Sequence, residues 1–132
     1  MIFVDSSVWI DYFNGKITSE TDYLDDILGL KPLVIGDIVL TEVLQGFRAD
    51  KDYKKAKELL LSLPVYEILN KERSLTCADN YRLLRKKGIT IRKTIDTIIA
   101  TYCIENELQL LFSDKDFKPF VEKMGLKSAI PT

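Results

Sequence analysis

The chain has 132 residues, of which 46% are hydrophobic and 30% are charged, a composition typical of a folded globular domain. Its 19 lysines and arginines balance 20 aspartates and glutamates, so the net charge of −1 gives no overall attraction to nucleic acid. The absence of histidine excludes Ser-His-Asp and Cys-His nucleophiles and HExxH zinc sites, and two cysteines are too few for a four-cysteine zinc site. Carboxylates are the plentiful reactive groups that remain, and they typically bind hard cations.

Short apolar segments alternate along the chain with segments of helical periodicity. The expected strands cover residues 2–4, 32–36, 65–69, 108–112 and 128–130. The expected helices cover residues 8–13, 18–28, 37–47, 51–63, 70–87, 94–105 and 116–123, with Ser6 or Ser7 capping the first. This alternation predicts a single α/β domain over residues 1–132, with a short, mostly parallel sheet flanked by helices on both faces.

The first residues lack the basic and long apolar segments of a secretory signal. No apolar run approaches the roughly 18 residues that a membrane span needs. The two cysteines fit a reducing compartment. We therefore expect a cytoplasmic protein with no membrane partner.

Two aspartates follow expected strands. Asp5 comes directly after the first strand, and Asp114 comes two residues after Phe112. Open α/β sheets bind ligands beyond the carboxyl ends of their strands, so these two side chains can meet in one crevice. The alternative for each is a turn residue or a helix cap, which is a common role of aspartate after a strand.

Two further acids interrupt largely apolar helices. Asp96 lies in a segment with little polar face, where an ionised carboxylate is costly unless it is paired or bound to a metal. Its alternative role is to stabilise the first helical turn through the helix dipole. Glu42 lies on the flank of the helix expected over residues 37–47, where a solvated edge position is the alternative.

Four converging acids without basic partners would repel one another, and a divalent cation relieves that repulsion. Mg²⁺ favours carboxylate oxygen, retains several waters and can activate one of them against a phosphodiester. Since the chain has no Gly-rich loop to cradle a nucleotide, hydrolysis is the favoured phosphoryl chemistry.

The segments that carry these acids resemble the motifs of PIN-domain ribonucleases. They are MIFVDSSVWI at residues 1–10, TEV at 41–43, IRKTIDTIIA at 91–100 and LLFSDKDF at 110–117. Length, motif order and spacing resemble those of the VapC toxins of type II toxin–antitoxin pairs, over essentially the whole chain.

The resemblance implies an α/β/α sandwich whose pocket binds Mg²⁺ or Mn²⁺ and positions a water for attack on RNA phosphate. The catalytic acids that it implies are Asp5, Glu42, Asp96 and Asp114. Among them Asp5, Asp96 and Asp114 are the expected metal ligands, with Ser6 supporting the site by hydrogen bonding. The resemblance also implies a VapB-type antitoxin that blocks the site, and a homodimer.

The fourth motif departs from the family pattern, because Phe112-Ser113 stands where many relatives have Thr, His or Asn. Asp116 therefore competes with Asp114 for the fourth role, although we expect it to cap the helix that follows.

A basic strip over residues 82–93 leads toward Asp96, and Arg92 is its member closest to the acidic motif. It can contact RNA phosphates, or it can be a solvated helix end whose cations complement the helix dipole. Two other functions stay open on the residues alone: an Mg²⁺-dependent phosphohydrolase acting on small phosphoesters, and a non-catalytic metal-binding regulatory domain.

Overall fold

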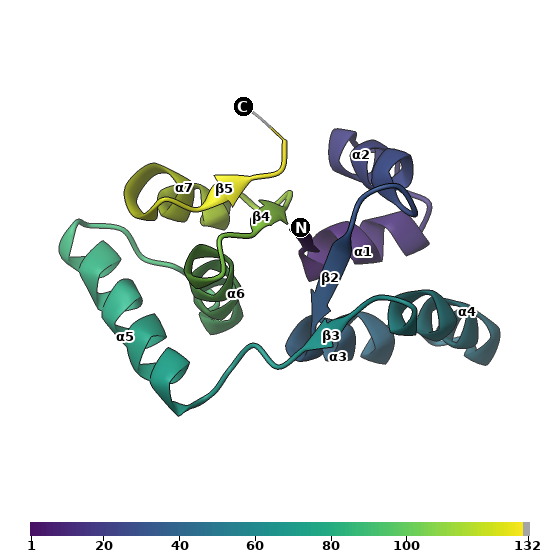
Figure 1. The fold of residues 1–132 in the computed structure, drawn as a ribbon, viewed down its shortest axis with the longest axis horizontal. Coiled ribbons are helices and arrows are strands. Elements are labelled where there is room, and N and C mark those ends of the chain that lie inside the picture. The colour runs from purple at the N-terminus through teal and green to yellow at the C-terminus, as the bar shows by residue number, and fades with distance from the viewer. Residues whose placement is uncertain (131–132) are drawn as a thin grey trace.

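The computed structural model describes residues 1–130, and at its centre lies a five-stranded sheet whose paired strands all run parallel (Figure 1). The strand order is β3-β2-β1-β4-β5. The strands are β1 (Ile2–Val4), β2 (Leu33–Gly36), β3 (Val65–Tyr66), β4 (Gln109–Leu111) and β5 (Lys127–Ser128). Each lies within or beside a predicted strand, so the α/β class expected from the sequence is confirmed.

Helices cover both faces of this sheet. Those that connect β1 to β2 and β2 to β3 lie on one face, and those that connect β3 to β4 and β4 to β5 lie on the other (Figure 1). They are α1 (Ser6–Phe13), α2 (Ser19–Ile27), α3 (Asp37–Gln45) and α4 (Asp50–Leu61) on the first face, then α5 (Lys71–Lys86), α6 (Thr94–Glu105), the 3₁₀ helix η1 (Lys115–Phe117) and α7 (Lys118–Met124) on the second.

Apolar side chains from the central strands and the helices on both faces form one core. Phe3 on β1, Leu110 on β4 and Ile99 on α6 are fully buried. Trp9 on α1 is fully buried as well, and its ring stacks on that of Phe13 with centroids 5.8 Å apart. These aromatic side chains therefore belong to the core, where each contributes a large apolar area.

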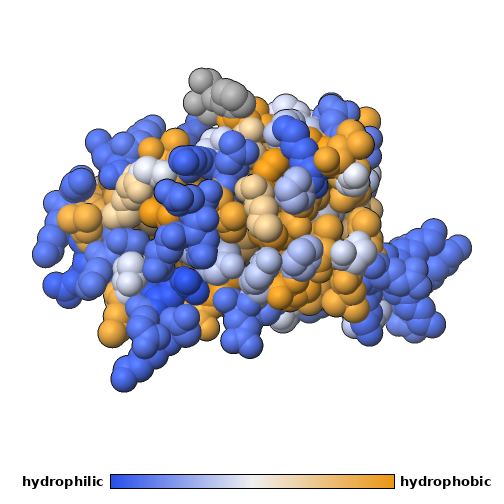
Figure 2. All heavy atoms as spheres, in the orientation of Figure 1, coloured by the Kyte–Doolittle hydropathy of each residue, from blue (hydrophilic) through white to orange (hydrophobic). Residues whose placement is uncertain are grey.

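Charged side chains lie on the outer faces of the peripheral helices. Figure 2 shows hydrophilic groups gathered over α5 on the left and projecting at the right, where α4 lies. Within residues 1–130, no helix has the length and apolar character that a bilayer crossing requires.

The strand order reverses direction between β1 and β4, and this reversal positions the functional site. From β1 the chain continues toward β2 at one side, whereas from β4 it continues toward β5 at the other. The connections therefore diverge at the carboxyl ends of β1 and β4, which is where open parallel sheets leave a crevice for ligands. A backbone hydrogen bond of 3.0 Å from the amide of Asp5 to the carbonyl of Leu111 holds the two strand ends together.

Candidate active site

Asp5 lies at the end of β1 and is the N-cap of α1, in place of the serines that the sequence suggested. Its Oδ2 accepts a 2.6 Å hydrogen bond from the Ser7 hydroxyl and a 3.4 Å bond from the Ser7 amide. Ser6, the expected supporting residue, contributes its backbone amide, while the side-chain donor is Ser7. Asp5 is only 3% exposed, and this burial raises its pKa above the usual range although the Ser7 hydroxyl opposes the shift.

Asp114 follows β4 and is the N-cap of η1, a position that the sequence analysis expected Asp116 to take. Its Oδ1 accepts a 2.9 Å hydrogen bond from the backbone amide of Asp116, which lies inside η1 instead of capping it. Its Oδ2 lies 3.4 Å from the ammonium of Lys93. The Asp116 amide and then the Lys93 ammonium lower the pKa of Asp114, so this carboxylate is ionised near neutral pH.

Asp96 lies in the first turn of α6 and is 4% exposed. Among the residues that the structure describes, its buried Oδ2 has no hydrogen-bond partner. Burial, followed by the charge of Asp5, raises the pKa of Asp96 to about 7. The helix dipole favours an acid in this first turn, but it leaves the buried Oδ2 without a hydrogen bond, so it does not by itself account for the burial.

Glu42 projects from the middle of α3 and is half-buried. Its Oε1 is buried and finds no partner within residues 1–130, unlike a carboxylate on a solvated helix edge. The charge of Glu42 contributes to the raised pKa of Asp5, which places the two carboxyl groups within electrostatic reach.

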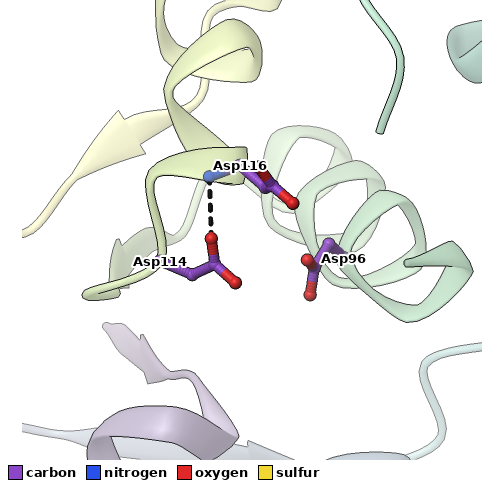
Figure 3. A group of neighbouring side chains, drawn as sticks. All are labelled: Asp96, Asp114 and Asp116. Atoms are coloured by element: carbon purple, nitrogen blue, oxygen red, sulfur yellow. Dashed lines mark hydrogen bonds between the residues drawn. The ribbon is translucent and has the colours of Figure 1, made fainter. Parts of the chain in front are cut away.

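Among the described residues, the structure brings Asp96, Asp114 and Asp116 into one close group and leaves Asp5 and Glu42 outside it. Carboxylate oxygens of Asp96, Asp114 and Asp116 all lie within 4.8 Å of one another, and Figure 3 shows the three side chains converging from α6, the β4 loop and η1. Asp5 connects this set to Glu42, because the charge of Asp5 acts on Asp96 and that of Glu42 acts on Asp5. Such an arrangement of oxygen donors can hold a hard divalent cation.

Two cations lie at the edge of this cluster. The Arg92 guanidinium is 3.0 Å from Oδ2 of Asp116, and its side chain is 71% exposed. Lys93, paired with Asp114, is 60% exposed. Each of these two side chains therefore contacts an acid of the cluster and is also accessible from solvent.

The sequence profile of the PIN domain matches residues 2–122, which include all of these acids and both cations. The chain belongs to the PIN domain family. Ribonuclease VapC11 of Mycobacterium tuberculosis is 24% identical over 131 residues, covering 98% of each chain.

Solved structures with this PIN fold agree over nearly the whole chain. The VapBC2 complex of Rickettsia felis, solved with a DNA fragment from its promoter, contains a chain with a TM-score of 0.73 at 20% identity, covering 97% of each chain. The sarcin-ricin loop cleaving toxin VapC20 of M. tuberculosis has a TM-score of 0.70 at 18% identity, covering 99% of this chain and 100% of that one.

Three contacts of this PIN domain were not foreseen from its sequence. The hydroxyls of Ser7 and Ser113 lie 3.2 Å apart, and since Ser7 donates to Asp5, Ser113 is the donor in this pair. Lys93 pairs with Asp114, and Arg92 pairs with Asp116. The departure at Ser113 thus has a structural role, because it links the β4 loop to the turn that holds Asp5.

Proposed function

We propose that this PIN domain, over residues 1–132, is a metal-dependent endoribonuclease and the toxin of a type II toxin–antitoxin pair. The observation that carries the proposal is the convergence of Asp96, Asp114 and Asp116 within 4.8 Å, with a buried Asp96 oxygen that has no partner among the described residues. The names of the relatives, a ribonuclease and a toxin that cleaves the sarcin-ricin loop, support RNA as the substrate.

The donor set suits Mg²⁺ or Mn²⁺, because every group in it is a carboxylate oxygen. The unpartnered oxygens of Asp96 and Glu42 fit a cation, since a buried carboxylate is costly without one. We assign Asp5, Asp96 and Asp114 as the metal ligands, Glu42 as a catalytic acid beside them, and Asp116 as a further candidate ligand. A bound divalent cation polarises a phosphate oxygen and lowers the pKa of water.

The residues of the chain itself prepare this chemistry. Ser7 holds the Asp5 carboxylate in one orientation, and the amide of Asp116 does the same for Asp114. A preformed set of acids spends little energy on ordering when it binds a cation. The exposed Arg92 at the edge of the cluster would contact a phosphate of the RNA backbone, and the names of the relatives favour RNA over a small phosphoester as the substrate.

We propose an antitoxin and a second copy of the chain as protein partners, in the cytoplasm where RNA is available. The solved relatives include a toxin–antitoxin complex from Klebsiella pneumoniae, with a TM-score of 0.69 at 20% identity over 100% of both chains. On α5, Leu75 is 63% exposed and Leu83 is 47% exposed, and a protein interface over this helix would cover both side chains. Light scattering of the purified chain measures the dimer, and titration with the antitoxin measures inhibition of RNA cleavage.

The decisive experiment measures cleavage of structured RNA by the wild type and by the Asp5→Asn and Asp96→Asn variants, with Mg²⁺, Mn²⁺ or EDTA. We expect metal-dependent cleavage that falls by about 100-fold or more in each variant, equivalent to ~2.7 kcal/mol of transition-state stabilisation. Asp26→Asn, on the exposed side of α2, is the matched control and should retain wild-type cleavage.

Cleavage that survives EDTA, or that is unchanged in folded Asp96→Asn, would overturn the proposal. Turnover of small phosphoesters without RNA cleavage would favour the phosphohydrolase. Metal binding with neither activity would favour the regulatory domain.

A further inference from the structure

Lys93 stands at a position that local helix chemistry disfavours. It is the N-cap of α6 and its side chain makes no capping hydrogen bond, whereas Ser, Thr, Asp and Asn are the usual residues there. The N-terminus of a helix carries positive partial charge, so an ammonium group at this point is repelled by the helix dipole. Local helix chemistry therefore does not explain the position of the Lys93 side chain.

That interaction is with the acidic cluster. The ammonium lies 3.4 Å from Oδ2 of Asp114, and the charges of Asp96 and Asp5 raise the pKa of Lys93 together with this contact. The neighbouring Arg92 pairs with Asp116 in the same way. Two cations on consecutive residues thus partly neutralise three carboxylates whose oxygens lie within 4.8 Å.

The Asp114 oxygen that Lys93 contacts is also the one left free for a metal. Oδ1 of Asp114 is engaged by the Asp116 amide, so Oδ2 is the oxygen without a backbone partner. A lysine ammonium and a divalent cation on the same carboxylate oxygen would repel each other strongly at contact distance. Lys93 is 60% exposed and flexible enough to leave.

We propose that Lys93 is an internal counter-ion of the acidic site, which pairs with Asp114 in the metal-free protein and is displaced from it when a divalent cation binds. This inference rests on the proposed metal site. It assigns Lys93 two effects: it stabilises the metal-free fold against repulsion among the acids, and it weakens metal binding. Metal binding then exchanges the Lys93 ammonium for the divalent cation, so the acids have a counter-charge in both states.

The first test follows Lys93 in the wild-type protein, without any substitution. Lysine labelling by a mild acylating reagent, resolved by mass spectrometry, is compared in EDTA and in saturating Mg²⁺. An ion-paired ammonium reacts slowly, so we expect labelling of Lys93 to become several-fold faster with Mg²⁺ while that of exposed Lys86 stays constant. Unchanged or slower labelling of Lys93 would overturn the proposal.

The second test measures Mn²⁺ affinity by calorimetry for the wild type, Lys93→Met, Lys93→Arg and Lys86→Met. We expect Lys93→Met to bind Mn²⁺ about three- to tenfold more tightly, because an ion pair of this exposure must no longer be broken and a nearby positive charge is gone. Lys93→Arg should stay close to the wild type, and so should Lys86→Met, which removes the same charge at a greater distance along the chain. Equal changes for Lys93→Met and Lys86→Met would reduce the effect to net charge and overturn the proposal.

Thermal unfolding separates this inference from the proposed function. In EDTA, Lys93→Met should unfold at a lower temperature than the wild type, and Mn²⁺ should raise its unfolding temperature by more than it raises that of the wild type. If the wild type binds no Mn²⁺, the proposed metal site is wrong. If the wild type binds Mn²⁺ and Asp96→Asn does not, but Lys93→Met binds as the wild type does, only the inference about Lys93 is wrong.

Discussion

The hydroxyl of Ser7 lies 2.6 Å from Oδ2 of the buried Asp5 and donates to it. Because Asp5 is 3% exposed, the charged form of this carboxylate depends on the few donors that reach it. Asp5 lies at the end of β1 and Ser7 lies in the first turn of α1. The turn between the strand and the helix therefore both buries the acid and provides its donor.

Removal of this donor should weaken the proposed metal site. In Ser7→Ala the pKa of Asp5 should rise further, since burial raises it already and Ser7 opposes that rise. Protons then compete better with the cation, and a lost hydrogen bond to a charged group costs about 1.5–3 kcal/mol, or roughly tenfold or more in affinity. Calorimetric titration with Mn²⁺ measures the change.

Ser6→Ala is the matched control, because the side-chain donor to Asp5 is Ser7. It should bind Mn²⁺ within about twofold of the wild type. Equal losses in the two variants would show that the Ser7 hydroxyl has no special role.

Asp96 should make the metal-free protein less stable as pH rises. Its pKa is about 7 in the folded protein against 3.8 in the unfolded chain, so the folded state holds a proton that the unfolded state has released. The contribution of Asp96 to the free energy of unfolding is fully present below pH 3.8, and it is lost as pH rises toward and through 7. Asp96→Asn should therefore gain about 1–3 kcal/mol relative to the wild type between pH 5 and pH 8, measured by urea unfolding in EDTA.

Saturating Mg²⁺ should reverse this trend in the wild type, because a bound cation favours the ionised carboxylate. Its effect on Asp96→Asn should be much smaller. Parallel stability curves for the two proteins from pH 5 to pH 8 in EDTA would contradict the environment assigned to Asp96.

Asp114 and Asp116 are the two candidates for the metal ligand of the fourth motif, and paired substitutions distinguish them. Asp114→Asn keeps a residue that caps helices well, so η1 should remain folded while Mn²⁺ affinity falls by about tenfold or more. Asp116→Asn removes the partner of the exposed Arg92, and such surface pairs contribute only about 0–1 kcal/mol. We expect its Mn²⁺ affinity to fall less than that of Asp114→Asn. The opposite order would show that Asp116, and not Asp114, is the metal ligand of this motif.

Much of this architecture is predictable because it depends on local pattern and strand order. The range predicted for α6 matches the observed helix, and aspartates at Asp5 and Asp114, directly and shortly after two central strands, predict a site at one edge of the sheet. Contacts between distant segments were not predictable, since they depend on how separate elements are rotated and spaced. Ser113 reaches Ser7, and Lys93 reaches Asp114, across 106 and 21 residues of sequence, and neither spacing carries a signal of its own.

Gly36 should be required for the packing of β2 next to the site, because the core leaves no room for a side chain at this position. A Cβ at this position would lie 2.8 Å from Cγ2 of Ile68 and 3.1 Å from Cζ of Phe3, both in the core. Gly36→Ala should therefore lower the free energy of unfolding by about 1–3 kcal/mol through overpacking, measured by urea unfolding. Gly46→Ala is the matched control, because its nearest neighbour would lie at 3.5 Å and its backbone is in the right-handed helical region. That variant should be neutral or stabilised by up to about 1 kcal/mol, and an equal loss of stability in both would show that backbone freedom, not space, explains Gly36.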